Sequence, residues 1–139
     1  MNDVTIRNYN KEDYFSVKEM LVEGGLFDET WDAEKSLEKR IEEKPDSIIV
    51  AIFENCVIGC VYLVDDILPL IFRLAVKKQY RRRGIGKMLI NEAAGRLKQH
   101  GHREIALFVD NDKEDLKNWY RKQGFTETKS TWVGFWKEL

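Results

Sequence analysis

The most informative part of the sequence reads Lys77-Lys78-Gln79-Tyr80-Arg81-Arg82-Arg83-Gly84-Ile85-Gly86-Lys87. Before this basic stretch comes the apolar run Leu70–Val76, which has the length and composition of a buried strand. After it, apolar residues recur at helical spacing until a stop at Gly101, namely at Ile85, Leu89, Ala93 and Leu97. The pattern predicts a buried strand, a basic glycine turn and a helix in direct succession.

The predicted turn combines features that favour a phosphorylated anion. Glycines allow the backbone to approach a ligand closely, and the first turn of a helix has unpaired N–H groups and a partial positive charge. Six of the eleven residues are Lys or Arg. Two familiar nucleotide motifs are excluded by spacing. A P-loop requires glycine at the position of Arg81 and Ser or Thr at Met88, and the dinucleotide fingerprint requires glycine at Leu89.

The spacing does match Arg81-x-x-Gly84-x-Gly86. Together with the preceding Leu74-Ala75-Val76 and a second signature, Trp119-Tyr120-Arg121-Lys122-Gln123-Gly124-Phe125, it resembles the acetyl-coenzyme A motif of the GNAT superfamily of N-acetyltransferases. The pattern of that family is Gln/Arg-x-x-Gly-x-Gly/Ala. The resemblance covers essentially the whole chain. Within the family, the chain is most similar to the small stand-alone bacterial members.

The resemblance implies one α/β (α+β) domain over residues 1–139, with a mixed central β-sheet of about six to seven strands and four helices. From the residues themselves we expect strands at 4–7, 47–53, 57–64, 70–76 and 104–109 and a strand-like aromatic tail at 125–139 that includes Trp132, Val133, Phe135 and Trp136. We expect helices from Asn10 to about Gly24, from Asp32 to Pro45, after Gly84, and from Asp112 or Lys113 to Gly124.

Composition and charge narrow the class of protein. The net charge is −1, but the basic stretch carries +6, so a positive site lies on an otherwise acidic chain. This asymmetry argues against a general nucleic-acid binder. No apolar run reaches the roughly 18 residues of a membrane span, and no signal peptide is recognised. Cys56 and Cys60, roughly 13 Å apart on one strand, are beyond disulfide reach, and we interpret them as reduced packing residues of a cytoplasmic protein.

The resemblance assigns cofactor-binding residues around the turn. Backbone amides from Arg82 to Lys87 would hold the pyrophosphate of acetyl-coenzyme A, and the backbone of Leu74 and Val76 would pair with its pantetheine arm. Arg81 occupies the motif's own position, while the contributions of Arg82 and Arg83 to phosphate binding stay open. The complete set of expected cofactor contacts is Leu74, Val76, Arg81, Arg82, Arg83, Gly84, Ile85, Gly86 and Lys87.

Tyr120 is the candidate catalytic residue. In the family, the tyrosine before the Gly-Phe segment donates a proton to the departing coenzyme A thiolate. The alternative is plain core packing, because Tyr120 also lies on a stripe with Leu116 and Trp119. The family asparagine seven residues earlier is replaced by Lys113, and Asn111 or Asn118 are out-of-register substitutes.

No general base is assigned by the sequence. Many family members have a glutamate on the strand before the glycine turn, where this chain has Leu70-Ile71-Phe72. The nearest acids, Asp65 and Asp66, are interpreted more simply as turn residues. His100 and His102 flank Gly101 at a helix end, where capping of carbonyls explains them better than metal binding, and no metal is expected.

These features predict an acetyl-coenzyme A-dependent N-acetyltransferase that uses direct attack by a primary amine. The alternatives are a non-catalytic acyl-coenzyme A binding or sensing module and, with less support, an RNA-binding domain that lacks the aromatic platform it would need. The acceptor is an amine-bearing small molecule or a protein or peptide amine, and the aromatic tail is a candidate homodimer surface. The acidic segment 19–34, which spans parts of the first two expected helices, either attracts a cationic amine or forms two solvated helix faces. Its acids are Glu19, Glu23, Asp28, Glu29, Asp32 and Glu34.

Overall fold

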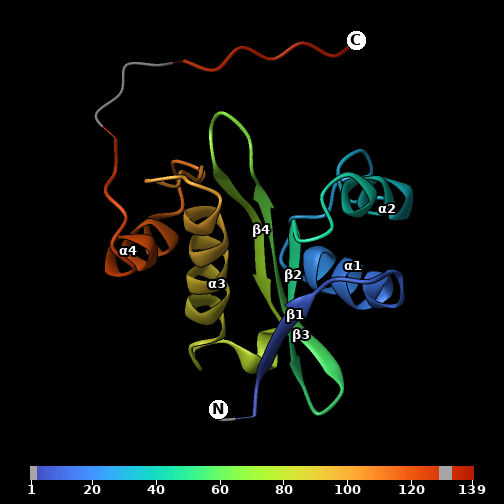
Figure 1. Cartoon of the computed structure of the whole chain (residues 1–139). Helices are drawn as coiled ribbons and strands as arrows, with labels where there is room; N and C mark the ends of the chain where they lie inside the picture. Colours follow the sequence, from blue (N-terminus) through green and yellow to red (C-terminus); the bar gives the residue numbers. More distant parts are fainter. Residues whose placement is uncertain (1–2, 129–132) are drawn as a thin grey trace. The chain divides into compact units, whose positions relative to one another are not determined.

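The computed structural model describes residues 3–128 and 133–139 (Figure 1). The chain forms two compact units, Met1–Leu107 and Phe108–Leu139, and each is described by itself. The first unit contains β1 (Thr5–Asn8), a 3-10 turn η1 (Lys11–Asp13), α1 (Tyr14–Glu23), α2 (Glu34–Glu43), β2 (Ile48–Phe53), β3 (Cys56–Val64), β4 (Leu70–Val76), η2 (Lys78–Tyr80) and α3 (Ile85–Gln99). The second unit contains α4 (Glu114–Lys122).

The four strands form one antiparallel sheet in the order β1-β2-β3-β4. The turn between β2 and β3 consists of Glu54 and Asn55, whose φ angles of 48° and 61° give the left-handed backbone of a tight hairpin. Most of β2 and nearly all of β3 is buried on both faces, as their unbroken apolar composition predicts.

Helices cover both faces of the sheet: α3 lies on one side, and α1 and α2 lie on the other (Figure 1). The predicted inward residues Tyr14, Val17 and Leu21 of α1 are buried. So are Ile85, Leu89, Ala93 and Leu97 of α3. The approach of α3 is close at Gly59 of β3, where a Cβ would lie 3.0 Å from Leu89 and 3.2 Å from Ile85.

The start of α1 follows the local sequence signal, and the start of α2 does not. The Asn10 side chain and Asp13 form the expected capping box before α1. The prediction that Asp32 starts the second helix is wrong, because α2 begins at Glu34 and the Asp32 side chain is fully buried. Its carboxylate forms an ion pair with a residue of β4, which is described below. If Asp32 capped α2 instead, that residue would have no counter-ion.

The described residues form a four-stranded sheet, in place of the six to seven strands expected. Of the predicted strand 104–109, only Ala106 pairs, in an isolated parallel bridge with Leu70. Residues 125–128 and 133–139 contain no strand, and the part of the tail prediction that concerns Trp132 lies outside the described residues. An apolar run acquires strand geometry only through non-local pairing, which the local pattern does not show.

Two further expectations are corrected. Cys60 is buried, and burial raises the pKa of its thiol to about 12, but Cys56 is exposed and does not pack in the core. Both are free thiols. On α4, Trp119 and Tyr120 are half-buried while Leu116 is exposed. Among the described helices, none combines the length and apolar character needed to cross a bilayer.

Candidate functional site

The turn between β4 and α3 has a backbone shaped by two left-handed residues. Arg82 has a φ angle of 62°, and Gly84, the N-cap residue of α3, has a φ angle of 83°. Gly84 has no side chain, so no side-chain hydrogen bond caps α3 at this end in the described part of the chain. The first amides of α3 therefore keep their hydrogen-bonding capacity and their share of the helix dipole. They form a donor group for an anion at the end of β4.

Cationic side chains surround these amides. Arg81, Arg82, Arg83 and Lys87 are exposed. The Arg81 Nε donates a hydrogen bond of 3.0 Å to the carbonyl oxygen of Val76, the last residue of β4. The guanidinium of Arg83 lies 5.6 Å from the ring centroid of Tyr80. The Arg81 side chain is thus held against the end of β4, and the Arg83 side chain is held beside the Tyr80 ring. These contacts restrict the positions of both positive charges.

The outer edge of β4 supplies a second set of backbone groups. Its inner edge pairs with β3, and Lys77 continues that ladder by donating to the carbonyl of Ile58 at 2.8 Å. Because amides alternate along a strand, the N–H groups of Leu74 and Val76 point to the other edge. There, within the described residues, β4 has only the single bridge at Leu70. An extended ligand segment can therefore pair with this half of the strand.

A bulge interrupts β4 immediately before these amides. The register with β3 shifts between Cys60 and Tyr62, and Arg73 in the bulge has a φ angle of 56°. The Nε of Arg73 lies 3.0 Å and 3.3 Å from the two carboxylate oxygens of Asp32. This pair is absent from the residues that the sequence pattern predicted for the site. The available signal was a charged residue within the apolar run 70–76, which requires a partner when the strand is buried.

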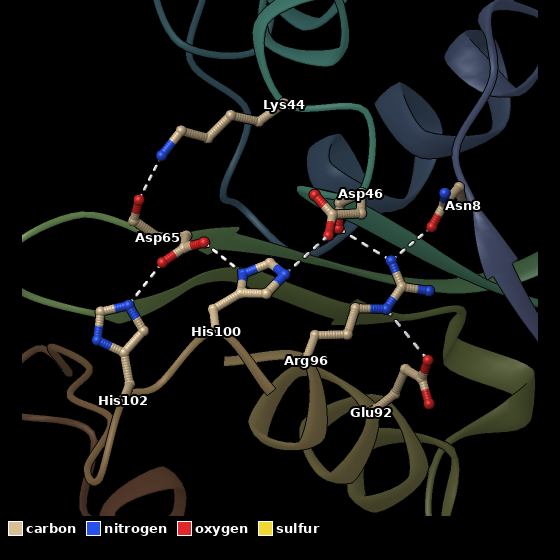
Figure 2. A network of polar contacts seen from close by, with 8 residues as sticks. All are labelled: Asn8, Lys44, Asp46, Asp65, Glu92, Arg96, His100 and His102. Atoms are coloured by element: carbon tan, nitrogen blue, oxygen red, sulfur yellow. Dashed lines mark hydrogen bonds and ion pairs between the residues drawn. The ribbon is translucent and has the colours of Figure 1, made fainter. Parts of the chain in front are cut away.

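Figure 2 shows where the two histidines lie. Their rings contact the carboxylate of Asp65, His100 through Nδ1 and His102 through Nε2 at 2.5 Å. The expectation that they cap helix carbonyls is therefore wrong. An acidic side chain after β3 is the better partner for two imidazoles than a helix carbonyl, since these hydrogen bonds are charge-assisted. Hydrogen bonds from His102 and His100 lower the pKa of Asp65.

The same network extends along the end of α3. Arg96 donates to the carbonyl of Asp46 at 2.9 Å and to the side chain of Asn8, and its Nε pairs with Glu92 at 3.1 Å (Figure 2). The Lys44 amine donates to the Asp65 carbonyl (Figure 2). These contacts join β1, the connection between α2 and β2, the β3–β4 connection and α3. Asp65 is therefore engaged in structural contacts and is a poor candidate for the missing base.

The family comparison bears on this strand, turn and helix together. The acetyltransferase (GNAT) family matches residues 5–125. The chain belongs to the GNAT acetyltransferase family. No curated protein matches.

Many solved structures have a similar fold. Ard1 from Thermoplasma volcanium has a TM-score of 0.79 at 23% identity, over 91% of this chain and 84% of that one. The PaiA N-acetyltransferase from Thermoplasma acidophilum, in complex with coenzyme A, has a TM-score of 0.77 at 24% identity, over 91% and 92%. An aminoglycoside 6′-N-acetyltransferase from Acinetobacter haemolyticus has a TM-score of 0.73 at 19% identity, over 97% and 99%. At these identities the likeness shows the fold alone.

In this GNAT family member, Tyr120 lies on α4 in the second unit. Its ring makes edge contacts with Trp119, at a centroid distance of 5.0 Å, and with Phe125, at 5.6 Å. Burial raises the pKa of Tyr120 to about 12, so the hydroxyl is protonated at neutral pH. The two substitute asparagines each have a cationic partner: Asn111 accepts from Lys117 at 2.8 Å, and Asn118 accepts from Arg121 at 2.7 Å.

The acidic segment of this acetyltransferase divides into buried and exposed members. Asp32 is fully buried and does not contribute to a surface field, which corrects its place in that set. Asp28 is exposed, and its carboxylate accepts from the amides of Thr30 and Trp31 at 2.8 Å and 3.1 Å. The remaining acids are exposed, namely Glu19, Glu23, Glu29 and Glu34.

A cavity of about 440 Å³ lies between α2 and the end of β3. Its lining includes Trp31, Arg40, Ser47, Leu63 and Asp65. The Ser47 side chain is buried, and its hydroxyl has no hydrogen-bond partner in the described part of the protein. Among the residues described, no group of three or more His, Cys, Asp or Glu side chains is arranged to hold a metal ion.

Proposed function

We propose that the protein transfers the acetyl group of acetyl-coenzyme A to a primary amine by direct attack. The main support for the proposal is that three sets of groups able to bind a ligand follow one another along the chain. The outward amides of β4 lead directly into a basic turn and then into the uncapped N-terminus of α3. A long ligand with a phosphorylated end and an amide-containing arm matches this sequence of groups.

The residues of the turn fit the pyrophosphate of coenzyme A. Amides from Arg82 to Lys87, with Gly84, Ile85 and Gly86 among them, are the proposed donors. The outward backbone of Leu74 and Val76 is the proposed partner of the pantetheine arm. Because the Arg81 Nε already donates to Val76, its proposed role is to hold the turn against the strand while its charge stays near the phosphates.

Acetyl-coenzyme A supplies the activated thioester. The chain's contribution is to stabilise the charge that develops on the carbonyl oxygen, which we assign to an outward amide next to the bulge of β4. The Tyr120 hydroxyl, held protonated by its raised pKa of about 12, is the proposed donor to the departing sulfur. The amine nitrogen bonds to the carbonyl carbon as the carbon–sulfur bond breaks, and the sulfur takes the Tyr120 proton. The excess amine proton passes to water, and Tyr120 regains a proton from water, so the net reaction converts amine and thioester into amide and thiol.

The proposed acceptor is an amine-bearing small molecule or a peptide amine. The cavity beside α2 is the candidate acceptor pocket, since its lining combines the aromatic side chain of Trp31 with polar residues. The Acinetobacter neighbour acts on an aminoglycoside, which is consistent with an amine acceptor in this fold. The exposed tail residues Val133, Phe135 and Trp136 remain a candidate homodimer surface.

A second function, non-catalytic binding of acyl-coenzyme A, is favoured by one observation. Leu70–Phe72 has no carboxylate, and the carboxylate of Asp65 is taken up by two histidines. Calorimetric titration with acetyl-coenzyme A and thiol release over a broad amine panel distinguish the two functions. Binding with turnover supports the transferase, binding without turnover on any amine supports the sensor, and no binding contradicts both.

A further inference from the structure

We propose that the ion pair between Asp32 and Arg73 is a positioning device for catalysis. It holds the bulge of β4 in the conformation that presents the Leu74 amide to the thioester carbonyl. This inference rests on the proposed function, because it concerns how the transferase polarises its acyl group. Arg73 and Asp32 are separated by 41 positions in the sequence, and neither belongs to the motif that identified the family.

The backbone of the bulge is strained at Arg73. Arg73 has a φ angle of 56°, in the left-handed region that non-glycine residues adopt at a free-energy cost. Such a conformation persists only where surrounding contacts enforce it. The bulge also sets which amides face outward, since one extra residue reverses the alternation of the strand. Whatever holds Arg73 therefore determines the direction of the Leu74 amide.

A buried carboxylate contacts the Arg73 side chain. The Asp32 side chain is 0% exposed and the Arg73 side chain 14% exposed, so water screens their contact little. The Arg73 Nε lies within 3.3 Å of both carboxylate oxygens, and its guanidinium lies 4.3 Å from the ring centroid of Phe72. Because Asp32 is fully buried, it does not contact an acceptor amine. It acts through Arg73, as a positioning residue and not as a base.

Asp32 also has partners in the connection between α1 and α2 and on α1 itself. The Asp32 carboxylate also accepts from the Asp28 amide at 3.0 Å, and the Tyr14 hydroxyl donates to the Asp32 carbonyl at 3.0 Å. Asp28 in turn accepts from the amides of Thr30 and Trp31. One carboxylate thus organises the connection between α1 and α2 and also anchors the bulge. The segment beside the candidate acceptor pocket and the polarising amide share a single buried contact.

The matched control is a second ion pair in the same unit. Arg7 on β1 contacts both carboxylate oxygens of Asp13, at 2.7 Å and 2.9 Å, and Asp13 is buried. This pair ties β1 to the start of α1 and lies away from β4 in the sequence and in the sheet order. The Arg7 side chain is 42% exposed, so only the carboxylate of this pair is buried. Neutralising the pair tests the general effect of losing an ion pair to a buried carboxylate, without disturbing the bulge.

The test compares the wild type with D32N/R73Q and with R7Q/D13N. Replacing both partners by neutral isosteres avoids a buried charge without a counter-ion, so the variants fold more readily than single substitutions. The probe is acetyl-coenzyme A labelled with carbon-13 at the acetyl carbonyl. Isotope-edited infrared spectroscopy reports whether that carbonyl accepts a hydrogen bond, which lowers its stretching frequency, and calorimetry reports affinity. Neither measurement requires a known acceptor.

We expect wild type and R7Q/D13N to lower the carbonyl frequency relative to acetyl-coenzyme A in solution. We expect D32N/R73Q to bind with a Kd within about threefold of the wild type while losing the frequency shift. Retention of the full shift in D32N/R73Q would overturn the inference. So would a wild type that binds without any shift, although coenzyme A binding would then stand. A wild type that does not bind refutes the proposed function itself.

A second variant covers the case in which D32N/R73Q does not fold. Arg73→Lys keeps the positive charge beside Asp32 and loses the guanidinium, with the Nε that contacts both carboxylate oxygens. We expect a folded R73K protein with a reduced carbonyl shift. An unchanged shift in R73K, with D32N/R73Q unfolded, would assign the pair to stability alone and would overturn the positioning role.

Discussion

The Nε of Arg81 donates a hydrogen bond to the carbonyl oxygen of Val76, across a distance of 3.0 Å. The first residue of the family motif is thereby joined to the last residue of β4. The contact closes the turn over the end of the strand and keeps a positive charge beside the first amides of α3. A motif position that could be interpreted as a simple phosphate ligand therefore also has an intramolecular partner.

This contact leads to the first prediction. Arg81→Gln should weaken acetyl-coenzyme A binding about tenfold, or about 1.4 kcal/mol, because it removes both the hydrogen bond to Val76 and a positive charge. The affinity should also depend less on salt than in the wild type, since fewer charges attract the phosphates. Calorimetry at two salt concentrations measures both effects. Arg103→Gln, an exposed site beyond the other end of α3, is the matched control and should change neither.

Tyr120→Phe tests the general acid. The ring keeps its contacts with Trp119 and Phe125, so cofactor affinity should be unchanged. Loss of the hydroxyl should lower kcat about 10²-fold where chemistry limits the rate. The control is Tyr9→Phe, which removes a buried hydroxyl without a partner among the described residues and should leave kcat unchanged. Full activity of Tyr120→Phe would assign Tyr120 to packing.

The same residue sets a pH expectation. A group that acts in its protonated form works below its pKa, and burial raises the pKa of Tyr120 to about 12. The wild-type kcat should therefore show no loss attributable to tyrosine ionisation up to about pH 10, whereas an ordinary tyrosine titrates near pH 10. A fall in kcat with an apparent pKa near 10 that disappears in Tyr120→Phe would contradict the buried environment described for this side chain.

Asp65 predicts how stability responds to acid. Its pKa is lowered in the folded protein by the histidine hydrogen bonds, so its ionised form favours folding. This contribution is present above the ordinary pKa of 3.8 and is lost as the pH falls through the lower folded value. Asp65→Asn should lower the Tm at neutral pH and reduce the Tm difference between neutral and acidic pH. Asp66→Asn, at the exposed neighbouring acid, should do neither.

The exposed acids near α2 predict an acceptor preference. If they attract a cationic amine, spermine should be a better acceptor than an acidic amine such as glutamate, and kcat/KM should fall as salt rises. The Debye length shrinks from about 30 Å at 0.01 M to about 8 Å at physiological ionic strength. Replacing Glu29 and Glu34 with Gln should weaken that salt dependence. Asp32 is unsuited to this test because it is buried. Equal turnover of spermine and glutamate at low salt would contradict the steering.

The strand, turn and helix of the site could be predicted from sequence because each depends on local information. The apolar run that became β4, the glycine spacing at Gly84 and the period of α3 were all visible within a few residues of one another. The pair of Asp32 and Arg73 was not, because its partners are joined only by folding. The extent of pairing at 104–109 could not be predicted for the same reason. A strand forms only where another part of the chain pairs with it, and here only Ala106 pairs.

The turn after β4 is the proposed binding site for the pyrophosphate of acetyl-coenzyme A, and calorimetric titration of a glycine variant measures whether it has that role. Gly86→Val places a branched side chain at the proposed phosphate site, whereas Gly84 is unsuitable because its φ angle of 83° strains any substitution. Gly95→Val on the same helix is the control, since a Cβ there meets nothing within 4 Å. We predict that Gly86→Val weakens binding at least about tenfold, or about 1.4 kcal/mol, in a protein that still folds, while Gly95→Val binds like the wild type. Unchanged affinity in a folded Gly86→Val protein would contradict the claim.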